Sequence, residues 1–122
     1  MYLIGADHPN KAAARRLLED AIADAETLCT DAEVLQEILH RFVAIRRPDD
    51  IDPALDVLLS VVDVVYSIEE ADVRRARRIL RRAERLSARD AIHVAIMQRH
   101  DVNDILSFDT AFDRMSGISR RS

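Results

Sequence analysis

Short apolar segments alternate along this chain with longer segments of helical periodicity, and this alternation constrains the fold more than any other feature. The clearest strand candidate is Val61-Val62-Asp63-Val64-Val65-Tyr66, because it is rich in β-branched residues. Strands separated by helices predict an α/β domain with a short parallel sheet. Further strand candidates lie at residues 26–30 and 104–108, and helix candidates lie at residues 9–25, 30–43, 51–59, 69–86, 87–97 and 109–115.

The composition fits one globular domain that covers residues 1–122. Hydrophobic residues make up 48% of the chain, which excludes a disordered protein. The two glycines and three prolines favour helices with short connections over an all-β domain. The single cysteine, Cys29, excludes an intramolecular disulfide and predicts a cytoplasmic location. No apolar segment approaches the roughly 18 residues needed to cross a bilayer, so we expect no membrane partner.

The arginines are concentrated in one part of an otherwise acidic chain. The net charge is −4, which argues against a general nucleic-acid coat, yet eight arginines lie between Arg74 and Arg89. Two interpretations of the Arg74–Arg85 helix stay open. Its arginines form either a solvated helix face or a rim that contacts phosphate groups.

Four acids fall where a parallel sheet would place a site, at strand ends and near the starts of helices. Glu37 lies in the second turn of the helix after the 26–30 strand, and Asp90 begins a largely apolar helix. Asp109 directly follows the 104–108 strand, and Asp113 lies one turn further. We therefore expect these acids to converge at one edge of the sheet.

Each of these acids also has a purely structural explanation. Glu37 precedes Arg41 by four residues, a spacing that allows a surface ion pair worth about 0.2–0.5 kcal/mol. Ser87–Asp90 has the form of a capping box at a helix N-terminus. Asp109 is equally placed to cap the last helix, and Asp113 to be an ordinary solvated acid. The spacing alone leaves both interpretations open.

A cluster of carboxylates raises the pKa values of its members and opposes folding unless a cation neutralises it. Mg²⁺ or Mn²⁺ is the expected cation, because hard divalent ions take oxygen ligands. A zinc site is not expected, since the four histidines show no zinc-ligand spacing with Cys29. His93 shares a helix stripe with Asp90, and we interpret it either as a hydrogen-bonded packing residue or as a neighbour of the site. The only glycines, Gly5 and Gly117, exclude a glycine-rich phosphate loop.

Taken together, four segments resemble the PIN-domain ribonucleases, and specifically the VapC toxins of bacterial toxin–antitoxin pairs. They are residues 5–9, 33–39, 87–95 and 106–113. The resemblance implies a three-layer α/β domain, with a short parallel sheet flanked by helices. It also implies a Mg²⁺- or Mn²⁺-dependent endonuclease that cleaves RNA, a homodimer, and a small antitoxin partner. By motif position, the resemblance makes Glu37, Asp90 and Asp109 the catalytic and metal-binding acids, with Asp113 as an auxiliary ligand.

The chain departs from that family pattern at its beginning. The family normally starts with a strand that ends in an Asp-Thr-Asn-like motif, whereas Met1–Gly5 resembles the segment just after it. We therefore expect the first strand and the first acid to be absent, and Asp7 is a poor substitute for that acid. A start codon placed too far downstream, a shortened chain and a degenerate toxin are the open explanations. The alternative function is a catalytically inactive PIN-like module that binds an antitoxin or dimerises.

Overall fold

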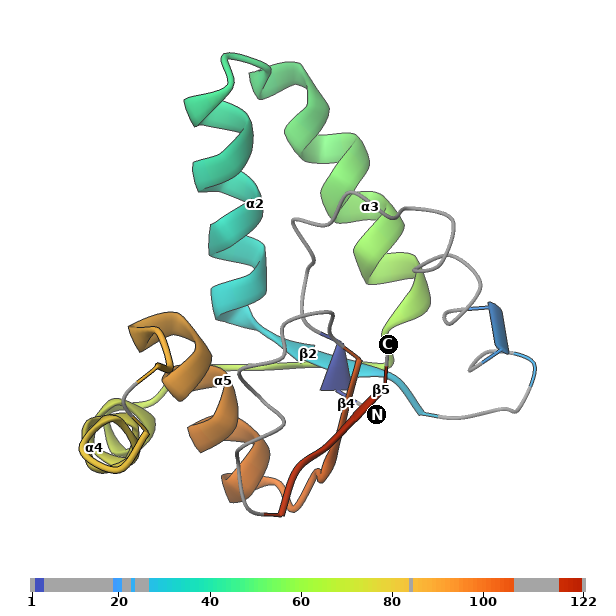
Figure 1. The fold of residues 1–122 in the computed structure, drawn as a ribbon. Helices are drawn as coiled ribbons and strands as arrows, with labels where there is room; N and C mark the ends of the chain where they lie inside the picture. The colour runs from blue at the N-terminus through green and yellow to red at the C-terminus, as the bar shows by residue number, and fades with distance from the viewer. Residues whose placement is uncertain are drawn as a thin grey trace.

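The computed structural model describes residues 2–3, 19–20, 23, 27–83, 85–106 and 117–121. The described strands form one parallel five-stranded sheet in the order β3-β2-β1-β4-β5, as an α/β fold requires (Figure 1). The predicted helix at 109–115 lies outside the described residues, together with Asp109 and Asp113, and so does most of the 9–25 helix. The strands are β1 (Tyr2–Leu3), β2 (Cys29–Asp31), β3 (Val64–Tyr66), β4 (Asp104–Leu106) and β5 (Ser119–Arg121).

The first strand is present and occupies the centre of the sheet, so the expectation that it is absent is wrong. Tyr2 of β1 pairs with Cys29 of β2 on one side and with Ile105 of β4 on the other. Without β1, the facing backbone groups of β2 and β4 would lose their hydrogen-bond partners. The apolar residues at the start of the chain satisfy these groups, although their sequence lacks the family's acidic motif.

The sheet also extends further than the sequence indicates at the other end of the chain. Residues 116–122 read as a frayed tail, yet β5 pairs in parallel with β4, with Asp104 opposite Ser119. The Ser119 N–H donates a hydrogen bond to the Asn103 carbonyl at 2.8 Å. This pairing covers an edge of β4 that would otherwise be open.

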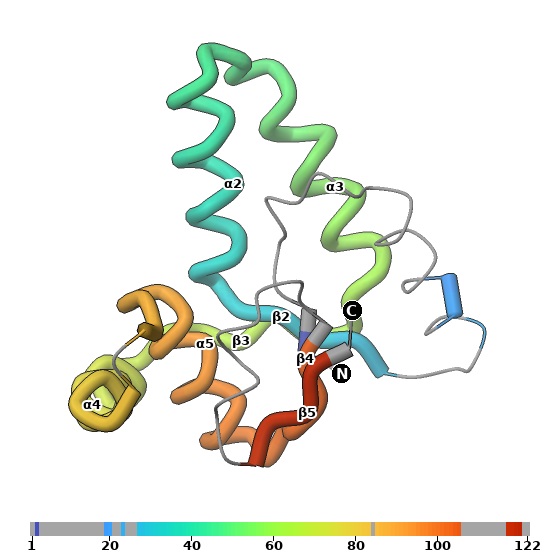
Figure 2. Tube along the Cα trace, in the orientation of Figure 1, coloured from blue at the N-terminus to red at the C-terminus, as the bar shows by residue number. Residues whose placement is uncertain are grey.

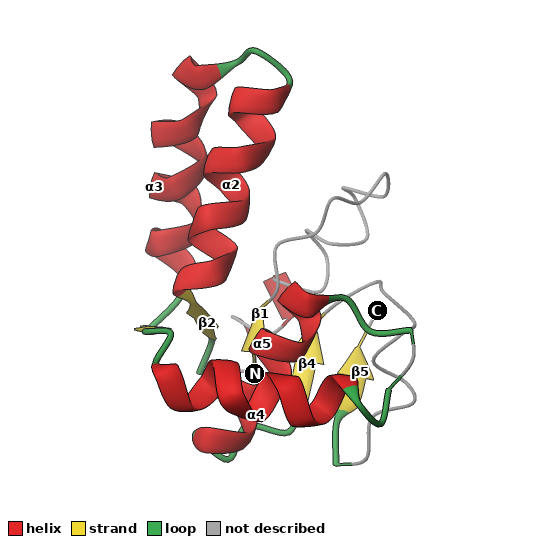
Figure 3. Ribbon diagram, turned by 90° about the vertical axis from the view of Figure 1, so that its left-hand side faces the viewer, coloured by secondary structure: helices red, strands yellow, loops and turns green. Residues whose placement is uncertain are grey.

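Two helical pairs flank the sheet. Helices α2 (Ala32–Ala44) and α3 (Ile51–Val61), joined through a 3₁₀ turn at Pro48–Asp50, form a hairpin that projects away from the strands (Figures 1 and 2). Helices α4 (Glu70–Leu80) and α5 (Ala88–Arg99) pack together beside the strands (Figure 3). No helix in these described segments is long and apolar enough to cross a membrane.

Helix α5 forms the middle of the core. Its residues Ala91 and Val94–Met97 are fully buried, as the apolar sequence of this helix predicts. They pack in one cluster with Tyr2 and Ile105 from the sheet and with Ile79 from α4. The α2–α3 hairpin behaves differently, because Leu39 and Val43, which the helical pattern places inward, are 46% and 62% exposed. That part of α2 extends beyond the sheet.

An ion pair between buried Asp72 and the partly exposed Arg99 fixes α4 against α5. Arg99 donates from Nε and Nη2 to the two carboxylate oxygens of Asp72, at 2.8 and 2.9 Å, and Nη2 also donates to the Ser67 carbonyl. Burial acts to raise the pKa of Asp72, but the hydrogen bonds from Arg99 and from the Glu69 N–H outweigh it and lower that pKa. Asp72 and Glu69 also form a reciprocal capping box at the start of α4.

Candidate functional site

The candidate site begins where β2 ends and α2 starts. Asp31 is the N-cap of α2, and its Oδ1 accepts a hydrogen bond from the Val34 N–H at 3.0 Å. The sequence places the capping box one residue earlier, at Thr30–Glu33. The shift matters because a carboxylate, rather than a hydroxyl, is thereby fixed at the end of a buried strand, and the Asp31 side chain is fully buried.

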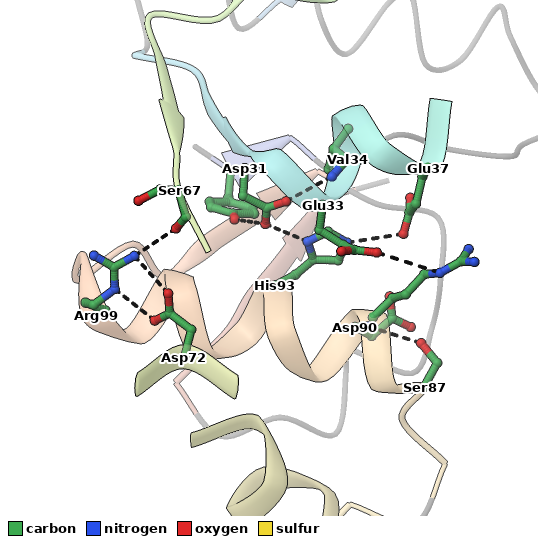
Figure 4. A network of polar contacts seen from close by, with 12 residues as sticks. Asp31, Glu33, Val34, Glu37, Ser67, Asp72, Ser87, Asp90, His93 and Arg99 are labelled. Carbon is green, nitrogen blue, oxygen red and sulfur yellow. Dashed lines mark hydrogen bonds and ion pairs between the residues drawn. The ribbon is translucent and has the colours of Figure 1, made fainter. Parts of the chain in front are cut away.

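The second oxygen of Asp31 is the centre of a buried polar network (Figure 4). It accepts hydrogen bonds from the Tyr2 hydroxyl and from Nδ1 of His93, the latter at 2.6 Å. Burial and the Asp31 charge raise the pKa of Tyr2, so its hydroxyl stays protonated. Burial acts to lower the pKa of His93, but its contacts with Asp31 and Glu37 outweigh burial and raise it to about 9. His93 therefore carries a positive charge at neutral pH.

His93 links this network to Glu37. Its Nε2 lies 3.5 Å from Oε1 of Glu37 and is buried without a hydrogen-bond partner among the described residues. Glu37 lies in the second turn of α2, as predicted, and its carboxylate points toward the histidine ring (Figure 4). Both interpretations of His93 are therefore correct: it is a hydrogen-bonded core residue, and it contacts a predicted site acid.

Glu33 is a further acid of this cluster that the sequence analysis did not assign to the site. It is 8% exposed, and its Oε1 lies 3.8 Å from Nε of Arg89. Burial and the charge of Glu37 raise the pKa of Glu33, while the charges of His93 and Arg89 act to lower it. The spacing of four residues between Glu33 and Glu37, which puts them on one helix face, is the signal that identifies it.

Asp90 lies in the first turn of α5, where its N–H donates to the Ser87 hydroxyl at 3.1 Å. This hydrogen bond confirms Ser87 as the N-cap, which is one half of the predicted capping box. Figure 4 shows the Asp90 side chain on the part of α5 that faces the start of α2, below Glu37. The fold therefore brings Glu37 and Asp90 to one region, from helices more than fifty residues apart in the sequence.

The described residues supply only part of a divalent-cation site. Glu37 and Asp90 offer oxygen ligands of the kind that Mg²⁺ and Mn²⁺ prefer. Burial first and the charge of Glu37 second raise the pKa of Glu33, and a bound cation would offset that charge. No group of three or more His, Cys, Asp or Glu side chains within the described segments could hold a metal ion. The other two predicted ligands, Asp109 and Asp113, lie outside those segments.

Known proteins resemble this chain both in sequence and in structure. A family model described as the PIN domain matches residues 1–118. A VapC ribonuclease of Mycobacterium bovis and Ribonuclease VapC13 of Mycobacterium tuberculosis are each 55% identical over 120 residues, which cover 98% of this chain and 92% of theirs. Ribonuclease VapC23 of Mycobacterium tuberculosis is 38% identical over 109 residues, or 89% of this chain and 86% of its own.

The fold is that of solved VapBC structures. VapBC2 from Rickettsia felis, bound to a DNA fragment from its promoter, matches with a TM-score of 0.73 at 15% identity. DNA-bound VapBC from Salmonella typhimurium gives the same TM-score at 14% identity. Each match covers 98% of this chain and 96% of the other. The chain therefore belongs to the PIN-domain family and, within it, to the VapC proteins.

Proposed function

We propose that this protein is a metal-dependent endoribonuclease, the toxin of a type II toxin–antitoxin pair, which hydrolyses RNA phosphodiester bonds. The observation that carries the proposal is the convergence of Glu37 from α2 and Asp90 from α5 beside the buried His93. The relatives at 55% identity are named as ribonucleases, which supports the same activity.

In this proposal Glu37, Asp90 and Asp109 hold Mg²⁺ or Mn²⁺, and Asp113 is an auxiliary ligand. When bound, the ion supplies activation of a water molecule and stabilisation of the negative charge that develops on the phosphodiester. Hydrolysis adds this water to the phosphorus and breaks one phosphorus–oxygen bond of the RNA backbone. The carboxylates thus have two functions: they bind the ion, and they accept hydrogen bonds that orient the attacking water.

The residues around the acids have supporting functions in this proposal. Protonated His93 draws the Glu37 carboxylate to one position, because its Nε2 faces Oε1 at 3.5 Å. The hydrogen bond to buried Asp31 in turn fixes the imidazole ring. Arg89 lies near Glu33 and offsets part of the repulsion between Glu33 and Glu37. Asp31, Tyr2 and His93 are therefore positioning residues rather than catalytic ones.

The proposal includes a protein partner. The matching solved structures are VapBC assemblies, which supports a small antitoxin as the partner of this chain. The exposed apolar side chains of the α2–α3 hairpin, among them Val43 and Val57 at 62% and 68% exposure, offer a surface for such a contact. A homodimer and a cytoplasmic location belong to the same proposal, and the buried, reduced thiol of Cys29 is compatible with a reducing compartment.

Cleavage of RNA in the presence of Mn²⁺ tests the activity. The parent chain should cut an RNA substrate, and Asp90→Asn should lose at least a hundredfold in rate because a carboxylate ligand is replaced by a neutral amide. Asp56→Asn, an equal change at an exposed position of α3, is the matched control and should cut like the parent. Equal rates for the parent and Asp90→Asn would contradict the proposal.

The second candidate is the inactive module that only binds an antitoxin or dimerises. Titration calorimetry with Mn²⁺ separates the two candidates. Saturable binding that is weakened by Asp90→Asn supports the nuclease, whereas absence of binding together with absence of cleavage supports the inactive module.

A further inference from the structure

A cavity lies between α4 and α5, apart from the acid cluster. It has a volume of about 270 Å³ and is lined by Arg75, Arg78, Ile79, Arg82 and Gln98. The three arginines follow each other at i, i+3 and i+7, so they share one side of α4 and of the turn that follows it. Ile79 is buried and forms the apolar floor, while the Arg78, Arg82 and Gln98 side chains are exposed at the rim.

The cations of this cavity differ from the other arginines of the two helices. Arg74 is paired with Glu70 at 3.2 Å, and Arg99 is held by Asp72. By contrast, none of Arg75, Arg78 and Arg82 forms an ion pair or side-chain hydrogen bond with a residue in the described part of the chain. Three like charges placed side by side repel each other, and an anion between them would remove that repulsion.

We propose that Arg75, Arg78, Arg82 and Gln98 form a binding site for phosphate groups of single-stranded RNA, separate from the acids that we assign to cleavage. The guanidinium group presents a planar fork of donors that matches phosphate oxygens, and Gln98 adds a neutral amide donor. The protein as a whole has a net charge of −4, so a local group of cations of this kind is needed to attract a polyanion.

The position of the cavity fits an RNA strand that reaches the acids. Gln98 and Asp90 lie at opposite ends of α5, eight residues apart, which is about 12 Å along a helix axis. A strand held in the cavity could therefore place a bond a few nucleotides away next to Glu37 and Asp90. This step rests on the proposed function, whereas phosphate binding itself does not.

The test measures binding without cleavage. A fluorescently labelled 12-nucleotide oligouridylate is titrated with the full chain in EDTA, at several salt concentrations, and followed by anisotropy. The pocket variant is Arg75→Gln/Arg78→Gln/Arg82→Gln. The matched control is Arg74→Gln/Arg77→Gln/Arg81→Gln, which removes the same charge at the same spacing from the neighbouring side of the helix. Thermal unfolding of each variant verifies that it is folded.

The pocket variant should bind at least tenfold more weakly than the control variant at low salt. Each phosphate contact contributes about −0.7 to the slope of log K against log salt for a single strand, so three lost contacts should flatten that slope by about 2. Equal affinities and equal slopes for the two variants would overturn the proposal, and so would a parent chain that does not bind the oligonucleotide. If the pocket variant binds more weakly than the control variant but the parent never cleaves RNA, the result would support the phosphate site and contradict the proposed nuclease activity.

A second probe separates RNA from an acidic protein partner. Polyglutamate of matched length carries the same number of negative charges but lacks phosphate groups. The RNA proposal predicts that polyglutamate competes at least tenfold less effectively than oligouridylate. If polyglutamate binds equally well and loses its binding in the pocket variant, the cavity is a site for an acidic peptide and the RNA assignment is wrong.

Discussion

The charge on buried His93 makes the stability of the folded protein depend on pH in a defined window. The pKa of His93 is about 9 in the folded state, against 6.5 as its ordinary value. A group whose pKa is raised on folding stabilises the protein fully below its unfolded pKa, and this contribution is lost as the pH rises through the folded pKa. At about 1.36 kcal/mol for each pH unit in this interval, the contribution amounts to about 3 kcal/mol.

Urea unfolding at pH 6.5, 8 and 9.5, followed by circular dichroism in metal-free buffer, measures this effect. The free energy of unfolding of the parent should fall by about 3 kcal/mol over that range, mostly between pH 7 and pH 9. His93→Gln should show a much smaller decline, because its side chain does not titrate. His40→Gln, a change at an exposed histidine of α2, should decline like the parent.

Two results would refute the reasoning. The first is a parent whose stability does not fall between pH 6.5 and 9.5. The second is a folded His93→Gln variant with the same decline as the parent, because the titrating group would then be another residue. If His93→Gln does not fold, the parent and His40→Gln curves still decide the first point.

Three further predictions concern neighbouring contacts. Arg99→Ala should lower the free energy of unfolding by about 3–5 kcal/mol at pH 7, because it leaves Asp72 buried without its cation, and chemical denaturation measures the loss. The lowered pKa of Asp72 adds stability that is present above its unfolded pKa and is lost as the pH falls through its folded pKa. The free energy of unfolding should therefore fall more steeply with decreasing pH in the parent than in Arg99→Ala. Glu33→Gln should keep or raise the thermal unfolding midpoint at pH 7, since it removes a carboxylate whose charged form is disfavoured by burial and by Glu37; a lower midpoint would contradict this.

The local features of the fold could be predicted from the sequence where one residue type dominates. The β-branched residues at 61–66 predict β3, and the buried helix α5 with its Ser87 cap follows from its apolar sequence. Glu37 lies near the start of a helix that follows a strand, and Asp90 begins a largely apolar helix, so local patterns point to both acids. In these cases the residues that determine the local structure are neighbours in the sequence, so the sequence pattern reveals them.

The contacts that complete the site are not visible in this way. Asp31 and His93 are separated by 62 residues, and no local pattern indicates that the capping carboxylate of α2 also holds a histidine of α5. The pairing of Tyr2–Leu3 is hidden for the same reason. The unpaired backbone groups that require a central strand belong to β2 and β4, which lie far from β1 in the sequence. The sequence could locate the acids, but it could not indicate how their charges are balanced.

The two-residue central strand has a consequence for the order of folding. Tyr2 pairs with Ile105, so β1 leaves the ribosome about a hundred residues before its partner in β4. At the usual synthesis rates of about 5–20 residues per second, this interval lasts roughly 5–20 s. During that time α2, α3 and α4 are already available, but the β1 edge that faces β4 is not covered. The centre of the sheet is therefore completed late in synthesis, and until then this edge of β1 is open to pairing with another nascent chain.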